Sequence, residues 1–413
     1  MRILLIHQYF LEKEDGGGSR FNEMSKIWAN NDHEITVIAG MVHYATGKKS
    51  DRYKGKFIYK DDQFYNNVDI LRCHVSESYN INFLGRLWAY FSFVFSSTYA
   101  GLFKTSQKYD IILVSSPPLF VGITAYILSK IKRIPYVFEV RDLWPESAID
   151  TGVLENKLII KFAYWFEKFV YKKAKLINVL TPPFRDRLIQ DKKVPAEKII
   201  FIPNAGDFIL AEKIQENFDA KQFKNELGLS DKFVITYVGA HGVANHLIQL
   251  IEAAERLQDT SIVFQLIGAG MRKKELIKET KKRNLTNVIF RDQVSKEEVF
   301  KYILASDAGA SVLKKVKTFK TIYSNKTFDY MSCKKPILLA IDGVSRKLIN
   351  DAECGIYVEP ENIDAIVEGS IALANKSIAE IKTMGESGFS FAKTHFDRNE
   401  LAKEYLEKIK LIL

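Results

Sequence analysis

The chain has 413 residues, which is too long for one ordinary hydrophobic core and favours two domains of roughly 200 residues each. Hydrophobic residues make up 47% of the chain and charged residues 27%, the composition of a globular protein. The net charge of +10 is compatible with an anionic partner such as nucleic acid, a phosphorylated substrate or anionic lipid. Charge alone fits a merely basic surface equally well.

The three cysteines, Cys73, Cys333 and Cys354, lie far apart in the sequence. They form no C-x-x-C pair and have no histidine at metal-ligand spacing, so they predict a reducing compartment and no metal. The first apolar run is too short for a signal peptide, and no stretch reaches the roughly eighteen apolar residues of a membrane span. These observations together predict a cytoplasmic protein.

The first half of the chain alternates strand and helix patterns. Residues 2–8 are apolar, residues 15–19 form a glycine-rich turn, and residues 20–30 have helical periodicity. Further strands are predicted at residues 34–39, 69–74, 111–115, 136–140 and 176–180. Strands that alternate with helices indicate a parallel sheet covered on both faces.

The alternation stops near residues 201–207, and the polar stretch that follows to residue 230 is interpreted as an interdomain connection. It then resumes with predicted strands at residues 233–237, 262–267, 288–291, 308–312, 337–340 and 356–358. A final helix over residues 390–413 is expected to pack back on the first domain. The sequence therefore predicts an α/β protein with two doubly wound parallel sheets facing a cleft, divided into residues 1–205 with 393–413, and residues 206–392.

The glycine-rich turn follows the first strand and opens the first helix. Gly16, Gly17 and Gly18 would let the backbone approach a ligand closely, and free N–H groups at a helix start favour an anion. Arg20 adds positive charge at the same end. The turn is therefore a candidate phosphate site, and a flexible surface turn is the alternative.

A cluster of charged and aromatic residues follows the predicted strand 136–140, at the edge where open α/β sheets bind ligands. Asp142 and Glu146 supply carboxylates that could orient a hydroxyl, Arg141 supplies a charge, and Trp144 supplies a stacking face for a sugar. An ordinary salt-bridge cluster in a loop is the alternative interpretation.

The segment that begins at Ser324 predicts a helix running to about Cys333. Ser324 suits an N-cap, so the amides of the first turn, including that of Asn325, could hold a phosphate with Lys326 beside them. Asp329 follows one turn later, within reach of a ribose. A solvated helix carboxylate is the alternative for Asp329.

Glycine turns also follow the first two predicted strands of the second half. Gly239 and Gly242 would offer backbone donors to a diphosphate, and His241 could donate to a phosphate or a sugar hydroxyl. A structural or solvated histidine is equally compatible with this position. Gly268 ends the next strand in the same way.

Two helical segments carry aromatic residues that suit a membrane surface. Residues 157–175 interleave Trp165 and other aromatic residues with six lysines, and we expect part of this basic amphipathic helix to contact an anionic bilayer. Residues 81–103 are more apolar, and a core helix is the stronger interpretation there.

Six of these features occur in an order and spacing that resembles the retaining glycosyltransferases of family 4. The likeness is strongest to the bacterial O-antigen and capsule transferases that include L-fucosamine transferases. The matching residues are 16–20, 140–147, 202–204, 238–242, 266–270 and 323–336. The resemblance implies a GT-B fold, no metal, a UDP-sugar or similar nucleotide sugar held mainly by the second domain, and an acceptor held by the first.

The resemblance also implies individual roles. Asp329 takes the place of the glutamate that binds the donor ribose, residues 324–326 match the helix start that binds the diphosphate, and Asn204 matches the interdomain Pro-Asn element. Gly16 and Gly17 match the glycine loop. The chain departs from the family at Thr321, where a first motif glutamate is expected, and around His241, where an Arg/Lys pair is usual.

The resulting hypothesis is retaining transfer of a sugar to a polyprenyl-diphosphate-linked glycan at the inner face of the plasma membrane. Asp142, Arg141 and His241 are the candidate catalytic residues, and Trp144 and Glu146 the candidate acceptor contacts. A nucleotide-sugar 2-epimerase and a non-catalytic binding partner are the alternatives. Nucleic acid is the least expected partner, because the basic residues are spread along the chain.

Overall fold

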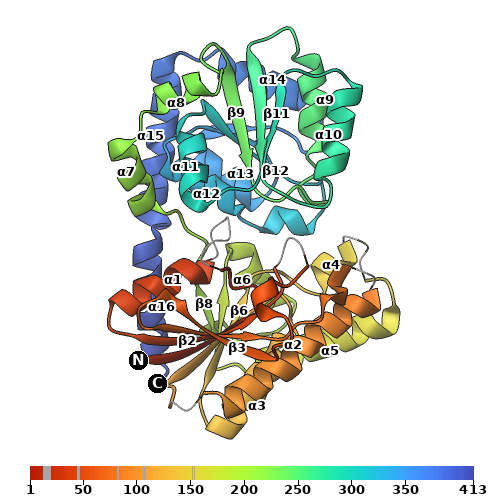
Figure 1. Cartoon of the computed structure of the whole chain (residues 1–413), viewed down its shortest axis with the longest axis vertical. Helices are drawn as coiled ribbons and strands as arrows, with labels where there is room; N and C mark the ends of the chain where they lie inside the picture. Colours follow the sequence, from red (N-terminus) through yellow and green to blue (C-terminus); the bar gives the residue numbers. More distant parts are fainter. Residues whose placement is uncertain (13–19, 44–46, 81–82, 106–107, 151, 153) are drawn as a thin grey trace. The chain divides into compact units, whose positions relative to one another are not determined.

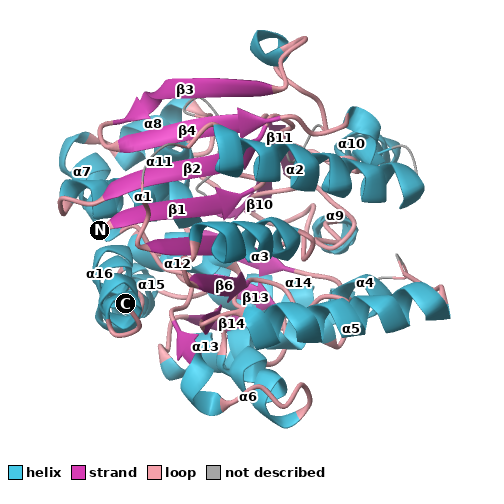
Figure 2. Ribbon diagram, turned by 90° about the horizontal axis from the view of Figure 1, so that it is seen from below, coloured by secondary structure: helices cyan, strands magenta, loops and turns pink. Residues whose placement is uncertain are grey.

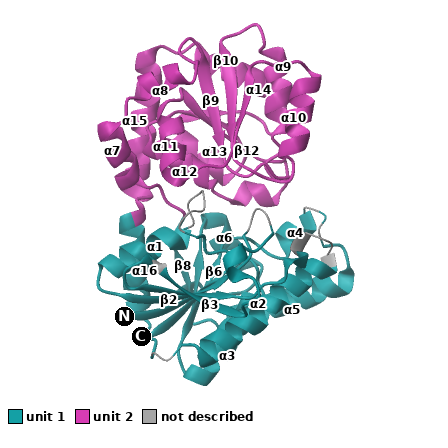
Figure 3. Cartoon of the chain, in the orientation of Figure 1, with its two compact units in different colours: residues 1–13, 18–203, 399–413 teal, residues 14–17, 204–398 magenta. Residues whose placement is uncertain are grey.

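The computed structural model describes residues 1–12, 20–43, 47–80, 83–105, 108–150, 152 and 154–413. The chain forms two compact units (Figure 3). The first contains the described residues up to Pro203 together with Asn399–Leu413, and the second is formed by Asn204–Arg398. The predicted glycine turn at Gly16, Gly17 and Gly18 lies outside the described residues.

Unit 1 is built on an eight-stranded sheet with the order β3-β4-β2-β1-β5-β6-β7-β8 (Figure 1). Every neighbouring pair is parallel except β3 with β4. The strands are β1 (Arg2–His7), β2 (Glu34–Gly40), β3 (Ile58–Tyr65), β4 (Val68–Cys73), β5 (Ile111–Ser115), β6 (Tyr136–Val140), β7 (Leu176–Val179) and β8 (Ile199–Phe201). Apolar runs such as Ile3–Ile6 are fully buried, as expected for strands covered on both faces.

Three helices lie side by side on one face of this sheet: α2 (Phe83–Phe103), α3 (Val121–Lys132) and α5 (Lys157–Lys173) (Figure 2). The β1-to-β2 crossover runs across the sheet in the opposite direction, so a right-handed connection places α1 (Arg20–Asn30) on the other face. There the indole Nε1 of Trp28 donates 2.8 Å to the carbonyl of Ala402 in α16 (Arg398–Lys410). The shorter helices of the unit are α4 (Glu146–Asp150) and α6 (Pro182–Gln190).

Unit 2 contains a six-stranded, wholly parallel sheet with the order β11-β10-β9-β12-β13-β14. Its strands are β9 (Phe233–Val238), β10 (Ile262–Ile267), β11 (Val288–Arg291), β12 (Ala308–Val312), β13 (Ile337–Ala340) and β14 (Gly355–Tyr357). Its helices are α7 (Phe208–Asn217), α8 (Ala220–Glu226), α9 (Ile248–Arg256), α10 (Lys273–Lys282), α11 (Lys296–Leu304), α12 (Asn325–Ser332), α13 (Val344–Asp351), α14 (Ile363–Ala374) and α15 (Ile378–His395). The predicted fold of two parallel-sheet α/β halves is confirmed.

Two local predictions are wrong. The polar stretch after residue 207 is not a connection, because it folds as α7 and α8 with Asp207 and Asp219 as their N-caps. The final helix is not continuous either: α15 ends at His395, and Gly206 pairs with Asp397 before α16 begins. Within the described residues, the chain passes between the units at Pro203–Asn204 and at Arg398–Asn399.

Candidate functional site

In unit 2, the backbone at the carboxyl end of β9 is hydrogen-bonded to the backbone at the carboxyl end of β10. The amide of Gly239 donates to the carbonyl of Ile267, and the amide of His241 donates 2.8 Å to the carbonyl of Ala269. A Cβ on Gly268 would lie 2.0 Å from the carbonyl oxygen of Gly239, and Gly268 has a φ of +145°. Only glycine fits this contact, so the edge of the sheet is lined by backbone rather than by side chains.

Lys326 brings a cation to this edge. Its ammonium lies 4.8 Å from the centroid of the Tyr237 ring and 3.5 Å from the Oγ of Ser324, and its Nζ lies 3.8 Å from the position of a Cβ built on Gly239. It makes no ion pair with a carboxylate in the described part of the chain. Burial lowers the pKa of Lys326 to about 8, while Asp329 opposes that shift. The amides of Gly239 and His241 are already bonded to carbonyls, so the predicted donation of the Gly239 amide to a diphosphate does not fit. An ammonium without a carboxylate partner among the described residues, beside the start of α12, still suits a bound anion.

The start of α12 lies at the same edge. Ser324 occupies the N-cap, as predicted, but its side chain makes no capping hydrogen bond, and Asn325 is exposed. The hydroxyl of Tyr330 accepts from the amide of Val238 at 3.1 Å and donates to the carbonyl of Ala310 at 2.9 Å. This buried hydroxyl fixes α12 against β9 and β12, so the helix start is held in position beside the Gly239 turn.

Asp329 lies one turn further along α12 and is half-buried. Burial raises the pKa of Asp329, whereas the charges of Lys296 and Arg398 lower it. Lys296 pairs with Asp207, and Arg398 donates 2.8 Å to the carbonyl of Ala205. Asp329 therefore lies near the charges of Lys296 and Arg398, which are held in place by their own partners. Its assignment to the donor ribose stays a prediction.

His241 was predicted either to donate to a phosphate or a sugar hydroxyl or to be structural, and its position favours the structural alternative. Its side chain is fully buried beneath the glycine turns, against Tyr237 and Phe290. Burial, and then the charge of Lys273, lower the pKa of His241 to about 4, so the imidazole is neutral at pH 7. The buried ring therefore packs beneath the turn and does not reach the protein surface.

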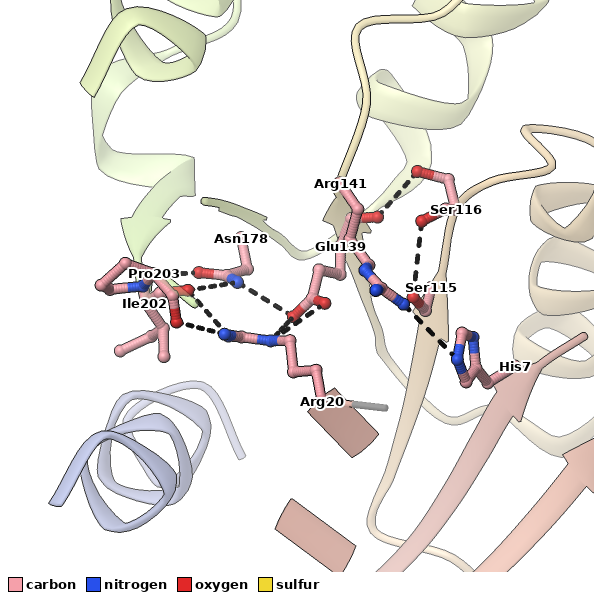
Figure 4. Close-up of polar contacts among 9 residues, drawn as sticks. All are labelled: His7, Arg20, Ser115, Ser116, Glu139, Arg141, Asn178, Ile202 and Pro203. Atoms are coloured by element: carbon pink, nitrogen blue, oxygen red, sulfur yellow. Dashed lines mark hydrogen bonds and ion pairs between the residues drawn. The ribbon is translucent and has the colours of Figure 1, made fainter. Parts of the chain in front are cut away.

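In unit 1, His7, Arg141 and Asp142 gather at the carboxyl ends of β1 and β6. The Nη1 of Arg141 lies 3.4 Å from the Nε2 of His7 (Figure 4), and the hydroxyl of Ser147 donates 2.6 Å to the carboxylate of Asp142. Burial raises the pKa of Asp142 and lowers that of His7. His7 was not among the predicted site residues, although its place as the last residue of the first strand could have indicated it.

Arg20 has structural contacts in place of the predicted phosphate contact. Its Nε lies 3.2 Å from both oxygens of Glu139, and its Nη2 donates 2.7 Å to the carbonyl of Ile202 (Figure 4). Its Nη1 donates to the carbonyl of Pro203, and Asn178 donates 3.0 Å to the same carboxylate. Arg20 is nearly fully buried, so it holds the end of the first unit together.

Glu146 likewise does not face an acceptor. It is buried and pairs with Lys192 at 2.5 Å, and Lys192 also pairs with Glu167 at 2.7 Å. Trp144 is half-buried and packs edge-to-face on Phe120, with ring centroids 5.6 Å apart. The ion cluster anchors the loop that carries Arg141 and Asp142.

The other predicted residues have defined positions, but their contacts do not indicate a role. Asn204 begins the Asn204–Arg398 segment of unit 2 and is half-buried, and Gly242 lies in the turn after β9. Thr321, where the family glutamate was expected, ends the short helix η4 (Thr318–Thr321) and donates 2.6 Å to the carbonyl of Thr318. The described residues contain no group of three or more His, Cys, Asp or Glu side chains placed to hold a metal ion.

Two protein-family models match the chain in sequence. The glycosyl transferase 4-like domain matches residues 15–205, and the glycosyl transferases group 1 domain matches residues 219–391. The two matches follow the order of the two units.

Two individual glycosyltransferases are similar to this chain in sequence. The chain is 24% identical over 375 residues to the putative colanic acid biosynthesis glycosyl transferase WcaI of Escherichia coli, covering 89% of this chain and 91% of the relative. It is 23% identical over 242 residues to an alpha-D-kanosaminyltransferase of Streptomyces kanamyceticus, covering 57% of this chain and 60% of the relative.

Solved structures share the fold across the whole chain. Anabaena Alr3699/HepE in complex with UDP-glucose has a TM-score of 0.71 at 17% identity and covers 100% of both chains. Sucrose-phosphate synthase from Thermosynechococcus elongatus has a TM-score of 0.72 at 14% identity, covering 100% of this chain and 98% of that one.

Proposed function

Because the chain belongs to the GT-B glycosyltransferases, we propose that it transfers a sugar from a nucleotide-diphosphate sugar, with retention, to a glycan of cell-surface polysaccharide biosynthesis. The observation that carries the proposal is the ammonium of Lys326, which lacks a carboxylate partner in the described residues and lies beside the glycine turn of β9. The WcaI relative supports the polysaccharide assignment, and the UDP-glucose complex of the HepE structure makes UDP the first nucleotide to test.

In the proposed reaction, the bond between the anomeric carbon and the diphosphate oxygen breaks, and an acceptor hydroxyl forms the new bond on the same face. The acceptor proton passes to the leaving phosphate, so no protein base is required. Negative charge grows on the diphosphate during this step. The amides of the α12 start, together with Lys326, would stabilise that charge more than the ground state.

Asp329 would bind the ribose, because it follows the helix start by one turn. On unit 1, Arg141 and Asp142 would position the acceptor at the carboxyl end of β6, with Trp144 beside them. Replacing Asp142 with asparagine should leave UDP affinity unchanged and reduce transfer. Full turnover by this variant would remove Asp142 from the reaction.

The acceptor we propose is a polyprenyl-diphosphate-linked sugar, met at the cytoplasmic face of the plasma membrane. Helix α5 supports this choice, because Lys161, Lys168 and Lys172 are exposed beside Trp165. A row of lysines with aromatic residues favours binding at an anionic lipid surface.

Donor binding is tested by thermal shift and calorimetry with UDP and a series of nucleotide sugars. A ligand at about 100 times its Kd should add roughly 2.7 kcal/mol of stability. Transfer is then measured as UDP release with polyprenyl-diphosphate glycolipids. Inversion of the donor sugar without an acceptor would instead identify an epimerase, and donor binding without turnover on any acceptor would identify a binding protein.

A further inference from the structure

Helix α2 exposes one apolar stripe along its whole length. The exposed fraction is 57% for Trp88 and 63% for Phe95, and both belong to a set of five large side chains. The set consists of Leu84, Trp88, Phe95, Tyr99 and Phe103. At 100° per residue these positions fall within about 100° of one another, so they form one face of the helix.

The opposite side of α2 is packed against the rest of unit 1. Ala89, Phe93 and Ala100 are fully buried, and a Cβ on Gly101 would lie 2.4 Å from a methyl group of Leu128 in α3. The interpretation of this segment as a core helix is therefore correct for one side only. Exposed apolar surface that is continuous over a helix of this length is typical of an interaction site.

Helix α5 lies in the same layer of helices as α2 (Figure 2). It presents a second apolar stripe. Leu158, Phe162 and Trp165 are exposed, with exposed fractions of 78%, 49% and 60%. Ile131 of α3, the helix between α2 and α5, is exposed as well. All three helices of this layer therefore carry apolar side chains at the surface.

The charges of the two outer helices all have one sign at the surface. Helix α2 contains no acidic residue and one arginine, Arg86, and the only acidic residue of α5, Glu167, is buried. The exposed lysines of α5 are Lys157, Lys161, Lys168, Lys172 and Lys173. Two helices that combine Trp, Phe and Tyr with lysines, and expose no carboxylate between Leu84 and Phe103 or between Lys157 and Lys173, complement anionic headgroups above an apolar layer.

We propose that α2 and α5 form a two-part docking surface for an anionic lipid bilayer, in which the α2 stripe enters the headgroup layer and the lysines of α5 contact the lipid phosphates. This inference rests on the proposed lipid-linked acceptor and adds α2 as the penetrating element. None of the described helices is both long enough and apolar enough to cross a membrane. The α2 stripe would therefore lie along the bilayer surface.

Vesicle co-flotation of the full chain tests the surface, with vesicles of phosphatidylcholine alone or with phosphatidylglycerol. The W88S/F95S variant should lose at least about tenfold in binding at every salt concentration, because the contribution of these side chains is apolar. The K161Q/K168Q/K172Q variant should lose mainly the binding that low salt favours. Ile378→Ser is the control, since Ile378 is 90% exposed on unit 2 and should leave binding unchanged.

Two outcomes would overturn the proposal. One is wild-type-like flotation of W88S/F95S while circular dichroism shows an intact fold. The other is a wild-type dimer that W88S/F95S dissociates without any change in flotation, which would assign the stripe to a second copy of the chain. UDP affinity, measured without vesicles, separates this test from the test of donor binding. Both variants should bind UDP as the wild type does. A wild type that does not bind UDP would refute only the proposed function.

Discussion

Arg20 and Glu139 form a buried ion pair, with 3.2 Å between Nε and the carboxylate, at the point where the chain leaves unit 1. The same guanidinium donates to the carbonyls of Ile202 and Pro203. The Arg20 side chain thus joins β6 to the last two residues before the chain enters unit 2.

Replacing only one partner of this pair should be costly. Glu139→Leu leaves a buried guanidinium uncompensated, and we expect a loss of about 3–5 kcal/mol in the free energy of unfolding of unit 1. Arg20→Met should cost a similar amount, and the double variant should cost less than the sum of the two. All four tryptophans, Trp28, Trp88, Trp144 and Trp165, belong to unit 1, so urea unfolding followed by tryptophan fluorescence reports this unit. Additive losses would show that the two groups do not interact.

Replacing Lys326 with methionine should have opposite effects on stability and binding. The substitution removes a desolvated charge, so unit 2 should melt at a higher temperature, while UDP binding should weaken about 10- to 100-fold. Calorimetry and thermal unfolding measure the two effects. Lys347→Met on the exposed surface of α13 is the matched control and should change neither. Unchanged UDP affinity in Lys326→Met would place the diphosphate elsewhere.

The affinity for UDP should also depend on pH through Lys326. In the free protein its pKa is lowered to about 8, so the ammonium loses its proton as the pH rises through 8, whereas a bound diphosphate would retain that proton. UDP affinity should therefore fall above pH 8, by at most about tenfold per pH unit. The Lys326→Met variant should show a flat profile there, and an equal slope in both proteins would assign the titration to another group.

Gly268 should tolerate no side chain. Alanine would place its Cβ 2.0 Å from the carbonyl oxygen of Gly239 at a φ of +145°, so the turn after β9 must move. We expect a loss of more than about 1–3 kcal/mol in the stability of unit 2 and loss of UDP binding. Gly228→Ala is the control: its φ is +71° and nothing lies within 4 Å of the added atom, so only about 1 kcal/mol of backbone strain is expected. Equal effects of the two substitutions would contradict the packing argument.

Glu167 should make the stability of unit 1 fall with rising pH. Burial raises its pKa to about 7, above the ordinary value of 4.5, so the folded state binds more protons between these two values. Its contribution is fully present below pH 4.5 and is lost as the pH rises through 7, with a slope of at most about 1.4 kcal/mol per pH unit. The difference in unfolding free energy between wild type and Glu167→Gln, measured from pH 4.5 to 8, isolates this contribution. A constant difference would mean that Glu167 does not titrate there.

Most of the fold could be predicted because the strands of parallel sheets are short, continuous apolar runs. The runs at residues 111–115 and 262–267 coincide with β5 and β10. Strand β3 was missed because Ile58–Tyr65 is polar and lies at the edge of the sheet, where only one neighbour constrains it. The break at Phe396–Asp397 was missed because its cause is the pairing of Asp397 with Gly206, almost 200 residues away.

The candidate site was predictable in position but not in the roles of its charged groups. The glycines at the strand ends and the N-cap Ser324 identify the carboxyl edge of the unit 2 sheet from local sequence alone. Whether Arg20, Glu146 and His241 face a ligand or the interior depends on distant partners such as Glu139, Lys192 and Lys273. A single sequence does not contain that information.

The return of α16 to unit 1 affects the order in which the protein can fold during synthesis. Trp28 is fully buried, and both its hydrogen bond to Ala402 and its contact with Tyr405 need residues beyond Asn399. Asn204–Arg398 form a continuous segment with its own sheet, so the second unit can be complete while the first still lacks its closing helix. The half of the protein that leaves the ribosome first is therefore the last to be complete.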